Sequence, residues 1–336
     1  MAHTPYPGGN DDHEDPNICA SHNGISWEVP AGLTNPIDDQ TGQPALNSDV
    51  DLKFGPGGVL FLFWRTYDVN ATGMEEQLYF TTSTDGVTWA PKQLFHQSNH
   101  NQLRLLSPSL LFDAGRWVMW AVDMVPSPNR VVRLESATAD PMSTWSAPAT
   151  VPVGAMQAGK EPWHIYITQH DGQLVGLLTD CTVGASGLAG DLLFLQSLDG
   201  LSFTNSGKPV IPRVLAGEHD QLYRSTLVTA VQDGVHGYRV WYAGWRTGPP
   251  SVWNLYRTWI GPPVTVSGSL HPPATIPAGG FTSIPVSFPA GSFTSPPHVT
   301  VTTDSARLTL GTTNITTTGF DLLAQNWSPA AAGTGV

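Results

Sequence analysis

Charged residues, cysteines and long apolar runs are all scarce in this sequence. Charged residues make up 12% of the 336 positions, about half of the roughly 25% that is typical of soluble domains. No run of about 18 apolar residues is present that could span a membrane. No window shows the capped, 3.6-residue apolar periodicity of a surface helix. The sequence therefore predicts few helices and no membrane insertion.

Positive charge is the scarcer sign. The chain has 15 Lys and Arg against 27 Asp and Glu, and its formal net charge is −12. No basic surface is expected to hold a phosphate backbone, which excludes nucleic acid as a partner. The amino-terminal segment lacks the basic and apolar regions of a signal peptide, which predicts synthesis in the cytoplasm without secretory export.

Several motifs that mark a catalytic class are missing. The sequence has no P-loop, no GxSxG elbow and no HExxH zinc helix, so it does not point to nucleotide binding, serine-type ester hydrolysis or a transition metal. Its two cysteines, Cys19 and Cys181, lie in strand-like runs far apart in the chain. We expect two free, buried thiols, because an unpaired cysteine behaves as a small hydrophobic residue.

Glycine and proline, in contrast, are abundant, at 34 and 29 residues. Short alternating or apolar runs bounded by Gly, Asp, Asn or Pro occur throughout the chain. This pattern is typical of many strands joined by tight turns and predicts an all-β protein.

A turn motif of the form Ser-x-Asp-Gly-x-Ser/Thr-aromatic recurs in the first three quarters of the chain. Its four copies span residues 21–27, 83–89, 136–145 and 197–203, of which the first has Asn in place of Asp and the third is longer and degenerate. Their aromatic residues are 62, 56 and 58 positions apart. This period is close to that of a four-stranded propeller blade. The Asp caps the turn and the Gly supplies positive φ, so we interpret the motif as structural rather than catalytic.

The segments between these turns predict a five-bladed β-propeller over residues 1–260. The inner strands of four blades are expected near residues 47–52, 106–110, 161–165 and 222–226, each followed by a strongly apolar second strand. The first blade lacks its innermost strand and is predicted to be incomplete.

Composition changes after Ile260. From Gly261 to Val336 only Asp304, Arg307 and Asp321 are charged. We expect a Pro- and Gly-rich linker over 261–280 and a small antiparallel β-sandwich over 281–336, with strands near 284–288, 298–302, 307–310 and 320–323.

Residues 1–260 resemble the five-bladed propellers of bacteriophage minor tail proteins, which are distantly similar to furanosidase-clan glycoside hydrolases. The matching segments are Thr4–Pro7, Glu14–Asn17, Gly24–Trp27, Gly32–Pro36, Asn47–Asp49, Ser107–Ser109 and Pro162–His164. Residues from about 281 onward are similar to H-type lectin domains. The segments that carry this second resemblance are Val286–Pro289, Phe293, Pro296–Val299, Asn314–Thr316, Thr318–Phe320 and Asn326–Trp327.

Together the two resemblances imply a virion protein of the phage tail that binds carbohydrate on a host surface without catalysis. They also imply a homotrimer, with host-surface glycan and other tail proteins as partners. The funnel residues expected to contact sugar are Asp49, Asp51, Trp163, His164, Tyr223 and Arg224, since aromatic faces and planar donors suit pyranose rings.

Two alternatives remain open at this stage. The first is a tail-borne glycoside hydrolase with Glu161 as acid and Asp49 as base. Related hydrolases carry three carboxylates, and here the third-blade position reads Ser107 and the first inner strand is lacking. If these residues are not catalytic, we expect Asp49 and Asp51 to bond neighbouring backbone amides and Glu161 to pair with Arg224 or Arg104. The second alternative is a purely structural tail component.

The acidic run from Asp11 to Asp15 raises the possibility of a calcium site, because hard cations take clustered carboxylate oxygens. Its spacing matches no twelve-residue calcium loop. We therefore interpret it as a solvated loop and predict no metal and no cofactor.

Overall fold

The computed structural model describes residues 1–7, 10–68, 75–185, 190–213, 220–232, 235–246, 252–261, 275–276, 281–288, 308–326 and 332–333. The chain divides into two compact units, Met1–Ile260 and Gly261–Val336. Within these described residues the elements are β-strands, with short 3-10 turns such as η2 (Asp11–His13) and η3 (Pro56–Gly58) between them. The all-β prediction is confirmed. No helix within the described ranges is long and apolar enough to cross a membrane.

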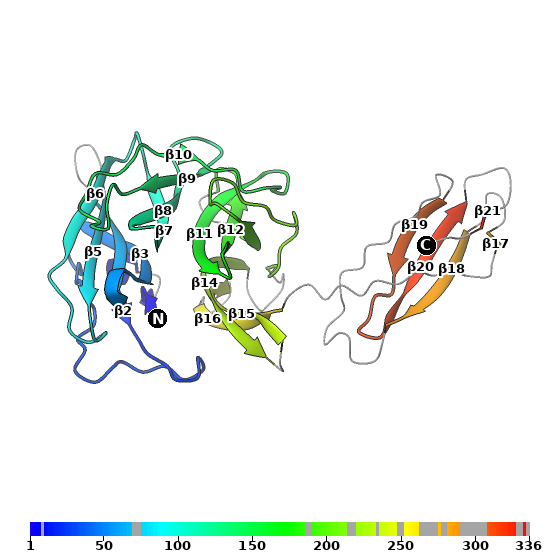
Figure 1. Cartoon of the computed structure of the whole chain (residues 1–336), viewed down its shortest axis with the longest axis horizontal. Helices are drawn as coiled ribbons and strands as arrows, with labels where there is room; N and C mark the ends of the chain where they lie inside the picture. The colour runs from blue at the N-terminus through cyan, green and yellow to red at the C-terminus, as the bar shows by residue number, and fades with distance from the viewer. Residues whose placement is uncertain are drawn as a thin grey trace. The chain divides into compact units, whose positions relative to one another are not determined.

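The unit Met1–Ile260 is a β-propeller in which antiparallel sheets are arranged about a common axis (Figure 1). In its described part, a two-stranded sheet pairs β1 (Ala2–His3) with β2 (Asn17–Ile18), and four larger sheets follow in chain order. These are β3 (Ala45–Phe54), β4 (Leu60–Asp68), β5 (Glu75–Ser83) and β6 (Gln93–Asn99); β7 (Leu105–Asp113), β8 (Arg116–Asp123), β9 (Arg130–Glu135) and β10 (Ala149–Thr150); β11 (Lys160–His170), β12 (Gln173–Thr182) and β13 (Leu192–Ser197); and β14 (Gln221–Gln232), β15 (Val235–Arg246) and β16 (Val252–Ile260). The inner strands β3, β7, β11 and β14 contact one another in succession.

The recurrent turns close by local hydrogen bonds. In the second copy Asp85 Oδ1 accepts the backbone N–H groups of Val87 and Thr88 at 2.8 and 2.7 Å. Ser83 Oγ accepts the N–H of Gly86 at 2.8 Å, and Gly86 has a φ of +75°. The same contacts recur in the copies at 21–27 and 197–203. Each turn thus needs only residues within six positions of one another, which explains why its sequence repeats.

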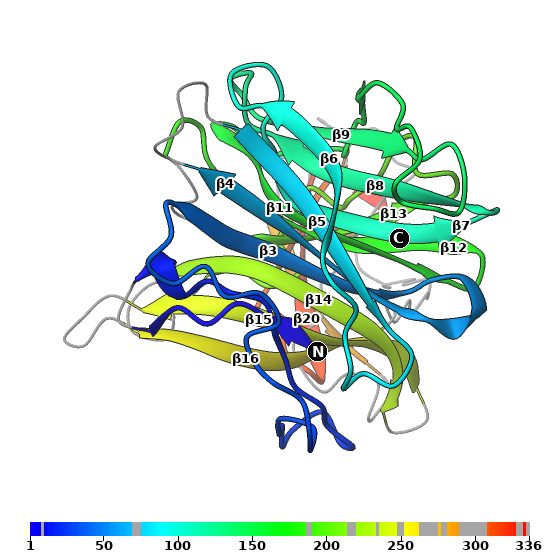
Figure 2. The same cartoon turned by 90° about the vertical axis from the view of Figure 1, so that its left-hand side faces the viewer.

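Tryptophan side chains join one sheet to the turn of another. Trp120 on β8 donates its indole N–H to the carbonyl of Gly200 at 2.9 Å. Trp241 on β15 donates in the same way to Gly24 at 3.2 Å and packs edge-on against Trp27. Figure 2 shows the amino-terminal segment lying beside β14, β15 and β16. The Trp241 contact therefore joins the last sheet of the unit to the first and closes the ring.

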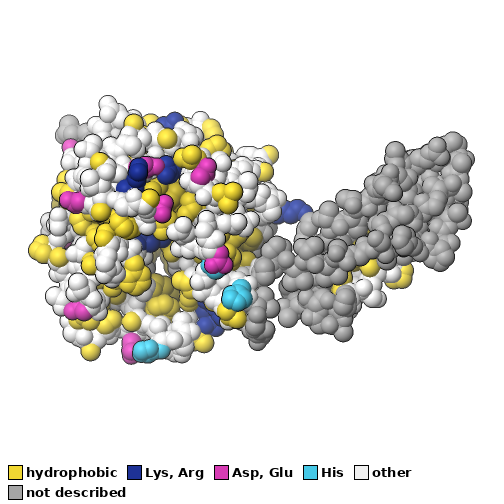
Figure 3. Space-filling model, in the orientation of Figure 1, with side chains coloured by type: hydrophobic (Ala, Val, Ile, Leu, Met, Phe, Trp, Pro, Cys, Tyr) yellow, Lys and Arg dark blue, Asp and Glu magenta, His cyan; other side chains and the backbone are white. Residues whose placement is uncertain are grey.

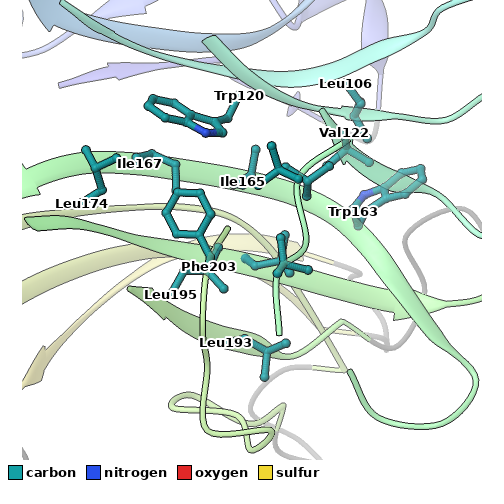
Figure 4. Packing of buried hydrophobic residues seen from close by; sticks show 14 of the residues in the cluster. Leu106, Trp120, Val122, Trp163, Ile165, Ile167, Leu174, Leu193, Leu195 and Phe203 are labelled. Carbon is teal, nitrogen blue, oxygen red and sulfur yellow. The ribbon is translucent and has the colours of Figure 1, made fainter. Parts of the chain in front are cut away.

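Apolar clusters fill the spaces between neighbouring sheets. Figure 4 shows one of them, in which Trp120 from β8 lies near Ile165 and Ile167 from β11, with Phe203 from the following turn. A second cluster packs Phe63 and Trp117 between the two four-stranded sheets. Full burial of each such side chain stabilises the fold by roughly 1.5–3 kcal/mol. Cys19 and Cys181 are both buried and neither forms a disulfide, so the prediction for the thiols is confirmed.

In the unit Gly261–Val336 the described strands form one three-stranded antiparallel sheet and one short pair. The sheet has the order β18 (Phe281–Ser287), β20 (Gly319–Asn326), β19 (Leu308–Thr313), and β17 (Thr275–Ile276) pairs with β21 (Ala332–Gly333). Phe320 and Leu322 are buried. The strand predicted at 298–302, most of the predicted linker, and the lectin-like positions Phe293 and Pro296–Val299 lie outside the described residues.

Candidate active site

A β-bulge interrupts each of the four inner strands at a corresponding place. The pairing shifts between Ser48 and Asp51 on β3, Leu106 and Ser109 on β7, Pro162 and His164 on β11, and Leu222 and Ser225 on β14. A bulge frees a residue from the ladder and redirects its side chain. The residues inside these four bulges include Asp49, Ser107, Trp163, Tyr223 and Arg224.

Asp49 and Ser107 also have an unusual backbone conformation. Both have a φ of +56°, in the left-handed region that residues other than glycine seldom occupy. Such conformations persist where surrounding contacts hold them, and they concentrate at functional sites. Here the backbone N–H of Ser107 donates to Asp49 Oδ2 at 3.2 Å.

Two arginines hold the buried carboxylate of Asp49. Arg65 Nη1 on β4 donates to Oδ2 at 3.1 Å, and Arg224 Nη1 donates to Oδ1 at 3.2 Å. Burial alone would raise the pKa of Asp49, but its electrostatic interactions with His164, Arg224 and Arg65 outweigh burial and lower the pKa to about 2. Asp49 is therefore ionised at neutral pH.

His164 lies beside this carboxylate, with Nδ1 3.6 Å from Asp49 Oδ1. Its side chain is only 2% exposed, and neither ring nitrogen has a hydrogen-bond partner among the described residues. Its ring packs edge-on against Tyr223, with centroids 4.0 Å apart. Burial lowers the pKa of His164 to about 3. A neutral imidazole with two unpaired nitrogens is costly to bury unless it binds something further.

Glu14 supplies a second carboxyl group to this region. It follows η2 and is half-buried. Burial, and then the negative charge of Asp49, raise the pKa of Glu14 to about 8, against an opposing effect of Arg65. Burial and the charges of Asp49 and Glu14 likewise raise the pKa of Tyr223. The site thus holds one ionised carboxylate and one carboxyl group that is protonated at neutral pH.

Of the other predicted residues, Asp51 makes structural contacts. Its Oδ2 accepts the backbone N–H of Leu110 at 2.7 Å, and Lys53 Nζ lies 3.6 Å from its Oδ1. Lys53 in turn donates to the carbonyl of Ile167 at 2.8 Å. The bulge between Ser48 and Asp51 interrupts the alternation that would otherwise put Asp49 and Asp51 on the same side of the strand.

Glu161 is occupied by loop backbone. Its Oε2 accepts the N–H of Asn129 at 2.8 Å and its Oε1 accepts the N–H of Gly184 at 3.0 Å. The predicted ion pair with Arg224 or Arg104 is wrong, because Arg224 binds Asp49 and Arg104 lies 3.4 Å from Glu76. Trp163, the neighbour of His164, is 7% exposed, and the two rings are 5.7 Å apart.

The acidic run is less solvated than its composition suggests. Asp15 is buried, and its Oδ1 accepts the side-chain N–H of Asn47 at 2.9 Å and the backbone N–H of Gln40 at 3.1 Å. Within the described part of the chain, no three His, Cys, Asp or Glu side chains are grouped so as to hold a metal ion. In Figure 3 the face of the propeller unit turned toward the viewer is hollowed near its middle.

Comparison with known proteins gives matches to enzymes of carbohydrate metabolism. No protein-family model matches the chain. A curated relative, the A type blood N-acetyl-α-D-galactosamine deacetylase of Flavonifractor plautii, is 24% identical over 277 residues, which cover 69% of this chain. The match covers 36% of that relative, so this chain spans about a third of its length.

One solved structure shares this fold. An N-acetylgalactosamine deacetylase from F. plautii, in complex with blood group B trisaccharide, superimposes with a TM-score of 0.69 at 21% identity, over 77% of this chain and 84% of that one. An exo-1,5-α-L-arabinanase from a bovine ruminal metagenomic library gives a TM-score of 0.47 at 12% identity, over 72% and 84%.

The predicted identity as a phage tail protein is wrong. The matches are to bacterial carbohydrate-processing enzymes, which also contradicts the virion localisation and the non-enzymatic role. The prediction rested on a resemblance between propellers, carried by segments such as Gly32–Pro36 and Asn47–Asp49. Such a resemblance indicates the shared architecture and not the function, because propellers host many unrelated functions. The predicted trimer and the cell-surface glycan partner stay predictions.

Proposed function

We propose that this chain is a carbohydrate-active hydrolase that removes the acetyl group from an N-acetylated hexosamine, with N-acetylgalactosamine as the first candidate. The observation that carries the proposal is His164, a buried imidazole with two unpaired nitrogens, 3.6 Å from the ionised Asp49. The activity of the Flavonifractor relative supplies the substrate class.

The residues of the site can supply a base, an acid and a positive charge for amide hydrolysis. Neutral His164, whose Nδ1 lies 3.6 Å from the Asp49 carboxylate, accepts a proton from water as the water oxygen attacks the acetyl carbonyl carbon. Glu14, protonated below its pKa of about 8, donates a proton to the leaving nitrogen. The C–N bond breaks, and the products are acetate and the free amino sugar. The Arg224 guanidinium, 17% exposed and beside Asp49, can stabilise the negative charge that develops on the carbonyl oxygen.

A second candidate function is glycoside hydrolysis, which is favoured by the opposite pKa displacements of Glu14 and Asp49. A glycosidase needs one protonated and one ionised carboxyl group across the bond. Glu14 would take the acid role that the sequence assigned to Glu161, whose oxygens are held by the amides of Asn129 and Gly184.

The test is incubation of the purified chain with an oligosaccharide that ends in N-acetylgalactosamine. Acetate is measured enzymatically, new reducing ends are measured colorimetrically, and the mass of the glycan is recorded. De-N-acetylation releases acetate and removes one acetyl mass without new reducing ends. Reducing ends without acetate would support the glycosidase instead.

Two variants and a control sharpen this assay. Asp49→Asn and Glu14→Gln are expected to lower turnover by at least about 100-fold, the low end of general acid–base contributions. Glu75→Gln, an exposed position on β5, should leave turnover unchanged. If a broad panel of N-acetylated glycans yields neither acetate nor new reducing ends, both proposed functions are overturned.

A further inference from the structure

Four aromatic side chains form a connected group next to His164. Tyr223 on β14 contacts Trp253 at 5.1 Å between ring centroids, Trp253 contacts Tyr6 at 6.4 Å, and Trp245 lies 6.3 Å from Trp253. We call Tyr6, Tyr223, Trp245 and Trp253 the aromatic arc. It begins at the His164 ring, 4.0 Å from Tyr223.

Trp253 is the centre of the arc. It lies at the start of β16, directly opposite Trp245 in the pairing with β15. Its contacts with Tyr223 and Tyr6 are edge-on or steeply tilted, with interplanar angles of 64° and 87°. Three neighbours from different segments therefore fix the orientation of this one indole.

The arc is unlike the core of the protein in its exposure. Core rings such as Trp64, Trp117 and Trp120 are at most 1% exposed. All four rings of the arc are only half-buried. Large rings that are held rigidly but left accessible offer apolar contact area at little entropic cost.

Two rings of the arc also interact electrostatically with carboxyl groups. Burial and then the charges of Glu14 and Asp11 raise the pKa of Tyr6, and burial and then the charges of Asp49 and Glu14 raise the pKa of Tyr223. A pyranose ring has an apolar C–H face and a rim of hydroxyl groups, so it matches aromatic faces flanked by carboxyl oxygens.

We propose that the aromatic arc is a separate sugar subsite, in which Trp253 stacks against the pyranose ring next to the one that reacts at Asp49 and His164. The ligand is therefore an oligosaccharide rather than a free amino sugar. This inference rests on the proposed function for its reacting residue, but its test measures binding and not turnover.

The experiment compares two probes by isothermal titration calorimetry and by quenching of tryptophan fluorescence. One probe is free N-acetylgalactosamine and the other is a trisaccharide that ends in it. The unsubstituted chain is expected to bind the trisaccharide more tightly. Trp253→Ala should weaken the affinity for the trisaccharide about tenfold, the effect of losing one aromatic contact of about 1.4 kcal/mol. The affinity for the monosaccharide should stay unchanged.

Matched variants keep this test decisive. Trp259→Ala removes another half-buried indole from the same strand, β16, whose ring contacts the Arg239 guanidinium. This variant should leave the affinity for both probes unchanged. Trp253→Phe should retain most of the affinity for the trisaccharide. If Trp253→Ala does not fold, Tyr6→Ala replaces it, with the same expected selectivity for the longer probe.

The outcomes separate the two proposals. Equal affinity for both probes, or equal weakening of both by Trp253→Ala, overturns the subsite even if acetate is released. Length-dependent binding that Trp253→Ala abolishes, without any acetate or reducing ends, supports the subsite and overturns the hydrolase.

Discussion

Arg224 on β14 donates to Asp49 on β3 over 3.2 Å, although the two residues are 175 positions apart in the chain. Arg224 also donates to the carbonyl of Pro108 on β7 at 3.0 Å. One guanidinium therefore connects three inner strands at the level of their bulges. Asp49 receives Arg65 on its other oxygen, so the charge at the centre of the site is held from two sides.

The first prediction concerns this central charge. Asp49→Asn leaves Arg65 and Arg224 facing a neutral group, and Arg65 is nearly fully buried. Removing one partner of a buried ion pair costs roughly 3–5 kcal/mol, so we expect a loss of that order in urea unfolding at neutral pH. The control is Asp171→Asn, an exposed position, which should stay within about 0.5 kcal/mol. Equal stability of the two variants would contradict the arrangement.

The second prediction concerns Glu76, the other partner of Arg65. Its Oε2 accepts from Arg65 Nε at 2.6 Å, and its Oε1 lies 2.8 Å from His100 Nδ1. Glu76→Gln should destabilise the chain by roughly 3–5 kcal/mol, because Arg65 loses its buried counter-charge. Glu75→Gln, one position earlier and exposed, should change the free energy of unfolding by less than about 0.5 kcal/mol. Chemical denaturation of both variants gives the comparison.

The third prediction concerns the pH dependence of turnover. Glu14, with a pKa of about 8, loses its proton as the pH rises through that value, so activity should fall on the alkaline side. His164 has a pKa of about 3, so the pH profile of activity should show no inflection near the pKa of free imidazole. A profile that rises through pH 8 would refute the acid role of Glu14.

The fourth prediction applies the same pKa to stability. The folded chain keeps the Glu14 proton up to about pH 8, whereas the unfolded chain releases it near the ordinary value of 4.5. The folded state binds more protons between these limits, so this group's stabilising contribution is complete below about pH 4.5 and is lost as the pH rises toward 8. As the pH rises across this range, the midpoint temperature of thermal unfolding should fall more steeply for the unsubstituted chain than for Glu14→Gln. Parallel curves would argue against the raised pKa.

The fifth prediction concerns the contacts between sheets. A Cβ on Gly200 would lie 2.5 Å from Trp120 Cζ2, and Gly200 has a φ of +71°. Gly200→Ala should therefore cost about 2–4 kcal/mol, the sum of left-handed backbone strain and overpacking. Gly172→Ala has a similar φ of +76° and nothing within 4 Å of the added carbon, so it isolates the backbone part, about 1–2 kcal/mol. Their difference in urea midpoint measures the indole contact.

The features that the sequence predicted correctly depend on local contacts. The turn at Ser83 to Thr88 forms from hydrogen bonds between near neighbours, so its sequence repeats visibly. The spacing of these turns located the inner strands, and with them Asp49, His164, Tyr223 and Arg224. These four residues do lie together at the bulges.

The features that were missed depend on contacts between distant segments. Glu14 was taken as part of a solvated loop, because nothing near it in sequence shows its electrostatic interaction with Asp49. Arg65 sits in an apolar strand, and a single charge within such a run was the available signal for a buried ion pair. The role suggested for Glu161 came from its place before Pro162, whereas its hydrogen bonds come from loops at Asn129 and Gly184.

The four aligned bulges have a consequence for how such a protein can change. Their residues lie where the ladder pairing shifts, so a new side chain there need not disturb the sheet pairing that defines the blades. New specificities could thus be engineered, or could evolve, by exchanging a handful of axial positions on an unaltered scaffold.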